Sequence, residues 1–95
     1  MARSVFISGP MTNIPRLNRP AFFEAERILA DHGYIAWNPA HHPDGLKHEQ
    51  YMHVCKAMLD VCDTIVQLPG WQDSKGATEE HQYALQRGMR IVEWR

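Results

Sequence analysis

Apolar residues in this chain fall either into short compact runs or into longer stretches in which they recur every three to four positions. The compact runs are rich in β-branched and aromatic residues, which is typical of buried strands. Turn-forming glycine and proline follow the first and third runs, and proline ends the second. These runs predict four strands, at Ser4–Ser8, Tyr34–Asn38, Thr64–Leu68 and Arg90–Trp94.

The periodic stretches predict three amphipathic helices. The first covers Pro20–Asp31, where Gly33 is expected to end the helix in a left-handed conformation. The second covers Glu49–Val61, and the third runs from about Ala77 to Gly88. Each helix lies between two of the predicted strands along the chain.

Strands that alternate with helices form a parallel sheet through right-handed crossovers. We therefore expect one α/β domain over residues 1–95, a small three-layer Rossmann- or flavodoxin-like fold with strand order 2-1-3-4 and helices on both faces. Ligands bind such sheets beyond the carboxyl ends of the strands. Three loops meet at that edge, at residues 9–18, 39–47 and 69–76.

Length and charge narrow the possible partners. A chain of 95 residues buries a modest core, which favours a homo-oligomer, either a dimer or a larger assembly. Ten Lys and Arg residues against eleven Asp and Glu leave no positive excess, so binding to a nucleic-acid polymer is disfavoured. No apolar run approaches the roughly 20 residues of a membrane span, and the opening residues lack a signal-peptide pattern. We expect a soluble cytoplasmic protein without membrane contact.

Neither the cysteines nor the histidines predict a metal site or a cofactor. Cys55 and Cys62 are seven residues apart, a spacing that fits neither redox nor zinc motifs, so both are interpreted as reduced, half-buried thiols. His41 and His42 are adjacent and have no carboxylate or thiol at ligand spacing. They are interpreted as loop residues that are available to contact a base or a phosphate.

Glu80 is the most informative carboxylate in the sequence. Its spacing from Ala77, Tyr83 and Ala84 places it on the inward face of the third helix, whereas the neighbouring Glu79 points about 100° away, as an ordinary surface charge. A carboxylate at the ligand edge of a sheet can attack or stabilise a cationic sugar carbon. The alternative is that Glu80 is simply a charge near the start of a helix.

Several loop residues allow both a binding role and a structural one. Ser74 and Gly76 precede the third helix, where exposed amides can bind an anion, but Ser74 or Asp73 can equally cap that helix. Gly9 allows a ligand to approach the backbone, yet a glycine-proline turn after a strand is common. Trp71 can stack on a base or cover the edge of the sheet.

Three groups of residues together resemble one protein family. They are Phe6–Thr12 (FISGPMT), Asn38–Ala40 (NPA), and the stretch from Cys62–Asp63 through Leu68–Trp71 (LPGW) to Ser74, Gly76–Ala77 and Glu80. The chain resembles the short phage and bacterial branch of the nucleoside 2-deoxyribosyltransferase-like superfamily. The resemblance covers essentially the whole chain, and the spacing LPGWxxSxGAxxE is its most specific part.

This resemblance implies cleavage or exchange at the C1′–N bond of a 2′-deoxynucleoside or its 5′-monophosphate, without a cofactor. Glu80 matches the catalytic glutamate. Ser74 matches a serine that contacts the 5′-phosphate in related monophosphate N-glycosidases, whereas transferases acting on free nucleosides carry an aspartate there. The substrate-binding residues implied are Phe6, Ser8, Gly9, Pro10, Met11, Asn38, Pro39, His41, Trp71, Ser74 and Gly76.

Two positions depart from the family pattern. Phe6 stands where a tyrosine usually orients the glutamate, and Cys55 stands where an aspartate usually supports the sugar and the leaving base. Loss of a positioned acid-base group commonly costs about 100-fold or more in rate. A non-catalytic nucleotide-binding module is therefore the alternative function. A purely structural oligomer would leave the inward position of Glu80 unexplained.

Overall fold

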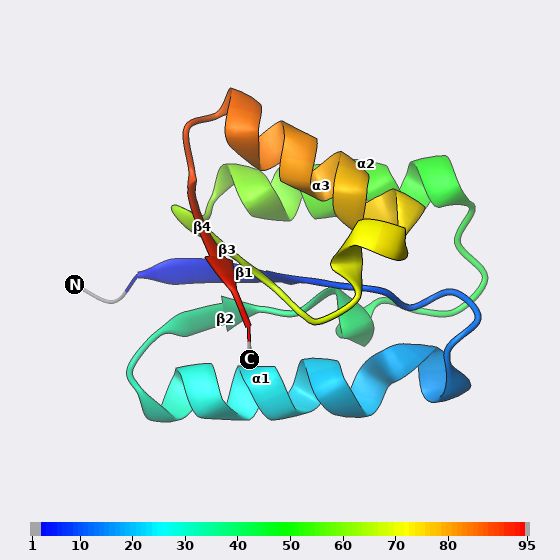
Figure 1. Ribbon diagram of the computed structural model, residues 1–95, viewed down its shortest axis with the longest axis horizontal. Helices are drawn as coiled ribbons and strands as arrows, with labels where there is room; N and C mark the ends of the chain where they lie inside the picture. Colours follow the sequence, from blue (N-terminus) through cyan, green and yellow to red (C-terminus); the bar gives the residue numbers. More distant parts are fainter. Residues whose placement is uncertain (1–2, 95) are drawn as a thin grey trace.

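The computed structural model describes residues 3–94 and has a parallel four-stranded sheet at its centre (Figure 1). The strands are β1 (Ser4–Ser8), β2 (Ile35–Trp37), β3 (Thr64–Gln67) and β4 (Arg90–Glu93). They lie in the order β2-β1-β3-β4, and each neighbouring pair is parallel. The predicted α/β fold and strand order are confirmed.

Helices cover both faces of this sheet, as predicted. Helix α1 (Arg19–Asp31) lies below the sheet in Figure 1, while α2 (His48–Asp60) and α3 (Lys75–Gln86) lie side by side above it. Gly33, at φ +88°, follows α1 in the predicted left-handed conformation. The three layers therefore come from the predicted β-α alternation.

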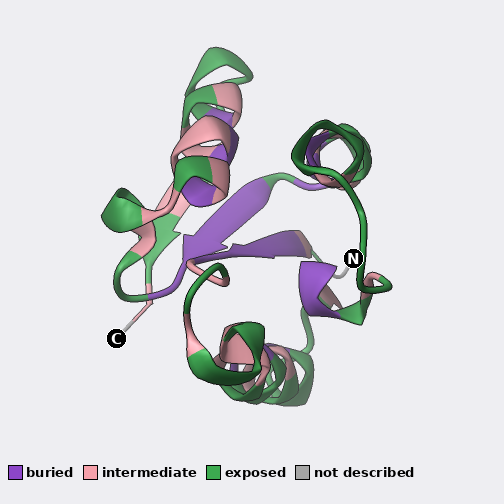
Figure 2. Ribbon diagram, turned by 90° about the vertical axis from the view of Figure 1, so that its right-hand side faces the viewer, coloured by how far each residue is buried: buried purple, intermediate pink, exposed green. Residues whose placement is uncertain are grey.

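The alternation of side chains along β1 supplies both halves of the core. Val5 and Ile7 pack in a cluster with α1, whereas Phe6 packs in a second cluster with α2 and α3. Figure 2, which looks towards the right-hand side of Figure 1, shows buried residues concentrated in the sheet and on the inner faces of the helices. Ser8, the last residue of β1, is fully buried and points toward α3.

Strand register brings the loops that follow β1 and β3 together. Phe6 pairs with Ile65 and Ser8 with Gln67, so these two strands end side by side. Since the sheet is parallel, the loops after β1, β2 and β3 leave from the same edge. The three loops predicted to form the ligand edge therefore leave the sheet at the same edge, as expected.

Element boundaries differ from the predictions by one or two residues, and short turns were missed. β2 excludes Tyr34 and Asn38, and α3 begins at Lys75 because Ser74 caps it. Each loop at the ligand edge contains a 3-10 turn, namely η1 (Pro15–Asn18), η2 (Pro39–His41) and η3 (Trp71–Asp73).

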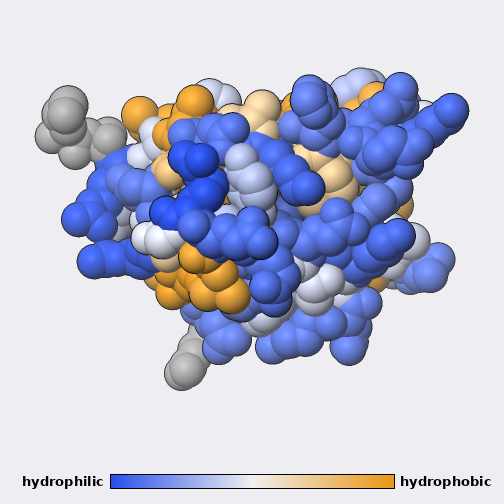
Figure 3. Space-filling view, turned by 90° about the horizontal axis from the view of Figure 1, so that it is seen from above, coloured by the Kyte–Doolittle hydropathy of each residue, from blue (hydrophilic) through white to orange (hydrophobic). Residues whose placement is uncertain are grey.

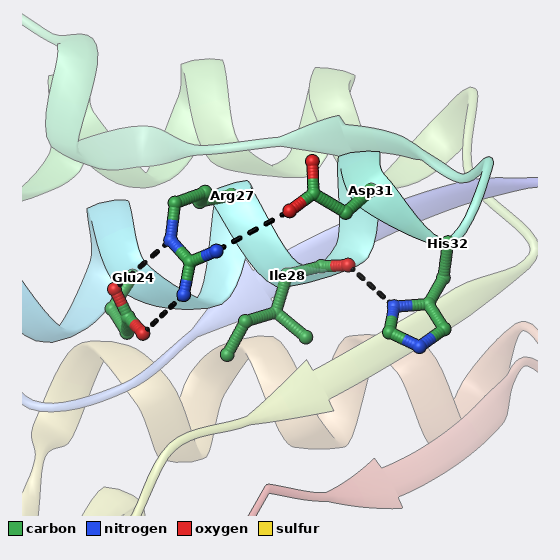
Figure 4. A network of polar contacts seen from close by, with 5 residues as sticks. All are labelled: Glu24, Arg27, Ile28, Asp31 and His32. Atoms are coloured by element: carbon green, nitrogen blue, oxygen red, sulfur yellow. Dashed lines mark hydrogen bonds and ion pairs between the residues drawn. The ribbon is translucent and has the colours of Figure 1, made fainter.

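The outer surface is largely polar. On α1, Arg27 bridges Glu24 and Asp31, and the His32 ring contacts the carbonyl of Ile28 (Figure 4). The face seen from the α2 and α3 side is mainly hydrophilic, with separate hydrophobic patches (Figure 3). Within residues 3–94, no helix combines the length and apolar character needed to cross a membrane.

Candidate functional site

Glu80 is buried between α3 and the end of β1. Ser74 caps α3 by accepting a hydrogen bond from the Ala77 amide at 3.2 Å, and the inward face of the helix then carries Ala77, Glu80 and Ala84. The Glu80 side chain is only 2% exposed. Its Oε1 atom accepts a 2.6 Å hydrogen bond from the Ser8 hydroxyl. Glu80 thus faces inward, as its spacing in the helix predicted.

Burial decides the protonation of Glu80. Removal from water raises the pKa of this carboxyl group to about 7, because the charged form is poorly solvated there. The Ser8 hydroxyl and then the Cys55 thiol oppose that shift and lower the pKa, while the nearby Glu79 charge raises it further. Among the described residues, no donor forms a hydrogen bond with Glu80 Oε2. The group therefore changes charge close to neutral pH.

Helix α2 forms the second wall around Glu80. Cys55, fully buried, and Tyr51, partly buried, lie four residues apart on the same face of this helix. The Tyr51 hydroxyl donates to Met11 Sδ at 3.2 Å, and its ring packs edge-on against His42. Burial raises the pKa of Tyr51 and that of Cys55, and the Glu80 carboxylate adds to both shifts. Both side chains therefore keep their protons at neutral pH.

Two cavities open at the ligand edge of the sheet. One has a volume of about 450 Å³ and is lined partly by Pro39, Arg19 and Tyr51. The other, of about 440 Å³, lies between the loop after β1 and the start of α3. Met11, Thr12 and His48 line both cavities. Together they provide space of the size that small-molecule sites use.

The structure gathers most of the predicted β1 and α3 residues at these cavities. Gly9, Pro10 and Met11 line the second cavity, opposite Ser74 and Gly76. Gly9 also has a packing role that sequence did not reveal, because a Cβ atom there would lie 2.8 Å from Leu68 Cβ. The close approach at Gly9 is thus made by a core side chain.

Five of the predicted binding residues, namely Phe6, Ser8, Asn38, His41 and Trp71, line neither cavity, and neither does Glu80. Phe6 is fully buried in the apolar cluster beneath α2 and α3. Asn38 caps η2 and donates to Glu26, which also contacts the exposed His41. Trp71 stacks on His81 with ring centroids 4.5 Å apart. Any contact of these five residues, or of Glu80, with a ligand remains a prediction.

Sequence reasoning missed several cavity residues. Tyr51 was assigned only to the apolar face of its helix, and His48 was not singled out. Glu79, expected to be a surface charge, has a side chain that is 37% exposed, and its carboxylate lies 2.9 Å from His48 Nε2. His48 could have been singled out from the sequence, because it is a polar residue at the start of a helix that faces the ligand edge.

The arrangement contains a buried acid, polar helix-start groups and adjoining cavities. At α3 the helix dipole and free amides favour an anion beside Ser74 and Gly76. Among residues 3–94, no group of three or more His, Cys, Asp or Glu side chains is placed to hold a metal ion. These features fit a small polar ligand that carries negative charge at one end.

Comparison with known proteins agrees with this fold. Residues 3–93 match the family model described as Domain of unknown function (DUF4406). The chain belongs to this family. A search among curated proteins finds no match to it.

A solved structure shares the fold of this DUF4406 domain. The 2-desoxiribosyltransferase from Leishmania mexicana superposes on it with a TM-score of 0.77 at 14% sequence identity. The similarity covers 97% of this chain and 63% of that protein, so this chain spans less than two thirds of its length. The domain therefore has a nucleoside 2-deoxyribosyltransferase-like fold, as the sequence resemblance predicted.

Proposed function

We propose that this protein cleaves the N-glycosidic bond of a 2′-deoxynucleoside or its 5′-monophosphate, by hydrolysis or by transfer to another base. The observation that carries the proposal is the buried Glu80–Ser8 pair, which sits at the carboxyl end of β1. Gly9, the residue after Ser8, lines one of the two cavities at this edge. The shared fold with a 2-desoxiribosyltransferase supports it.

In the proposed reaction the ionised Glu80 carboxylate attacks C1′ of the sugar. The C1′–N bond breaks, its electron pair leaves with the base, and a Glu80 oxygen bonds to C1′. Water then displaces Glu80, so that overall water supplies a hydroxyl to C1′ and a proton to the base. In transfer, a second base replaces water. No cofactor takes part.

The orientation of a monophosphate follows from the charges around the second cavity. Its phosphate would lie at the start of α3, where Ser74 and Gly76 line the wall and the helix dipole is positive. Its sugar would then lie toward Met11, which borders both cavities, and its base in the cavity that Pro39 and Tyr51 line. This placement supports a 5′-monophosphate as the favoured substrate.

Chromatography of free base tests the proposal. The purified protein is incubated with each deoxynucleoside and each 5′-monophosphate, with and without a second free base to detect transfer. We expect base release from at least one substrate and its loss in Glu80→Gln. Glu24→Gln is the matched control, since Glu24 lies exposed on α1 and pairs with Arg27 there. Equal release by wild type and Glu80→Gln would refute the proposal.

A non-catalytic nucleotide-binding module is the second candidate. Phe6 and Cys55 favour it, because both are fully buried in an apolar cluster where polar groups were expected from the family. This candidate predicts that a nucleotide raises the melting temperature by mass action while no base is released. It also predicts that Glu80→Gln keeps that thermal shift.

Self-association remains a prediction on the present observations. Large apolar side chains are exposed, including Val61 just after α2 at 56%, Leu85 on α3 at 51% and Ile35 on β2 at 49%. A second copy of the chain would bury some of this surface. Light scattering coupled to size exclusion should give a mass of at least two chains, and a monomer at micromolar concentration would contradict the expectation.

A further inference from the structure

The buried carboxylate of Glu80 is incompletely hydrogen-bonded. Oε1 accepts from Ser8, but no donor among the described residues forms a hydrogen bond with Oε2, although Glu80 is only 2% exposed. The neighbouring Cys55 thiol is a weak donor. An ionised carboxylate can accept several hydrogen bonds, and leaving one oxygen buried without a partner is costly. A donor that can reach this oxygen would therefore favour the charged form.

Tyr51 carries a hydroxyl donor that is held by a weak acceptor. It donates to the thioether sulfur of Met11 at 3.2 Å, and thioethers accept hydrogen bonds poorly. Tyr51 packs against the apolar cluster that contains Cys55, and it lies one turn before Cys55 on α2. Cys55 lies against both the Tyr51 hydroxyl and the Glu80 carboxylate. The phenol and the carboxylate thus belong to the same buried group of side chains.

We propose that Tyr51 is a positioning residue for Glu80, and that its hydroxyl transfers its hydrogen bond from Met11 Sδ to the Glu80 carboxylate when a ligand displaces Met11. The kinetic consequence rests on the proposed function, whereas the hydrogen-bond transfer does not. Met11 borders both cavities, so its side chain is within reach of a ligand in either one.

Relative hydrogen-bond strength gives the direction of the transfer. A bond from a hydroxyl to a carboxylate is charge-assisted and about twice as strong as one between neutral groups. The titratable groups around Glu80 are Tyr51 and Cys55 on α2 and Glu79 on α3. Because burial raises the pKa of Tyr51 and of Cys55, both remain donors over the range in which Glu80 ionises.

A titration without substrate tests the transfer directly. The Glu80 carboxyl signal is followed by carbon NMR and assigned by its loss in Glu80→Gln. Met11→Leu keeps the side-chain volume but removes the sulfur acceptor, so the Tyr51 hydroxyl must find another partner. We expect the pKa of Glu80 to fall by about half a unit or more in Met11→Leu. The double variant Met11→Leu/Tyr51→Phe should restore the wild-type value.

An equal pKa of Glu80 in Met11→Leu and in the double variant would overturn the proposal. Tyr83→Phe is the matched control, because Tyr83 donates to Asp60 at the outer side of α2 and α3. It should leave the Glu80 titration unchanged. Should Met11→Leu fail to fold, Met11→Ile takes its place, and an equal pKa of Glu80 in Met11→Ile and in Met11→Ile/Tyr51→Phe would overturn the proposal.

Steady-state kinetics provide a second test of the positioning role of Tyr51. Tyr51→Phe should lower kcat about tenfold or more, change KM less than about threefold, and move the pH midpoint of base release upward. An effect on KM alone, with an unchanged midpoint, would assign Tyr51 to packing or substrate contact and overturn the positioning role. Absence of base release by the wild type would refute the proposed function, while the titration still tests the transfer.

Discussion

The Ser8 hydroxyl donates a 2.6 Å hydrogen bond to Glu80, a residue 72 positions later in the chain. The bond joins the last residue of β1 to the second turn of α3, and both side chains are buried. It stabilises the ionised carboxylate against the loss of hydration, so the charge on Glu80 near neutral pH depends on it.

Ser8→Ala should raise the pH at which base release begins. Loss of a hydrogen bond to a charged group costs roughly 1.5–3 kcal/mol, which corresponds to about one to two pKa units. Since burial already raises the pKa of Glu80 to about 7, the pH-rate midpoint should move to about 8 or above. A pH series of kcat/KM for both proteins measures it. An unmoved midpoint would show that Ser8 does not tune Glu80.

Glu80→Gln should stabilise the fold at alkaline pH. The pKa of Glu80 is about 7 when folded and 4.5 ordinarily, so ionisation of the folded protein is unfavourable. The stability that this group contributes in its protonated form is therefore present at low pH and lost as pH rises through about 7. At pH 8 the loss is at most about 3 kcal/mol.

Urea unfolding of wild type and Glu80→Gln at pH 5 and pH 8 measures this difference. Relative to wild type, the free energy of unfolding of Glu80→Gln should be higher at pH 8 than at pH 5, because the substituted amide keeps an acceptor for Ser8 without the charge. A difference that is the same at both pH values would mean that Glu80 stays in one protonation state. Glu24→Gln, on the exposed face of α1, provides the control.

Ser74→Asp should separate capping from phosphate binding. Aspartate caps a helix as well as serine does, so α3 should remain stable. Its negative charge lines the second cavity, however, and would repel a phosphate there. We expect kcat/KM for 5′-monophosphates to fall at least about tenfold, with little change for free deoxynucleosides. Parallel losses for both substrate types would argue against a phosphate at this position.

Gly9→Ala should destabilise the core without altering Glu80. The added Cβ would lie 2.8 Å from Leu68 Cβ, and such overpacking costs about 1–3 kcal/mol. Gly76→Ala is the matched control, since a Cβ there meets Met52 Sδ at an ordinary 3.6 Å and helix propensity favours alanine. The denaturant midpoints of both variants measure the difference in stability. Equal stabilities would show that β1 shifts to accommodate the methyl group.

The parts of the fold that follow a strong period could be predicted from sequence. The buried strand Ser4–Ser8 was placed correctly to the residue, because its apolar run has a clear end at Gly9. The turn η1 could not be predicted in this way. Arg16, Leu17 and Asn18 adopt φ values of +58°, +53° and +59° without a glycine to signal them. Residues other than glycine rarely adopt this left-handed conformation, so no local sequence pattern predicts three of them in a row.

The candidate site was predictable where it depends on one element and not where it depends on several. The inward position of Glu80 follows from helical spacing within α3 alone. The contact of Tyr51 with Met11 joins residues 40 positions apart, and the contact of His48 with Glu79 joins residues 31 apart. Neither pair shares a periodic pattern, so only the three-dimensional arrangement brings them together.

The strand order also determines when the site can form during folding. Strand β1 is made first but lies in the middle of the sheet, and its partner β3 begins only at Thr64. Pairing of β1 with β3 therefore closes a long loop, which slows folding relative to helical proteins. The Ser8–Glu80 pair joins β1 to α3, so it requires α3 to be packed in place. Burial of the Glu80 carboxylate therefore depends on segments that are 72 positions apart in the chain.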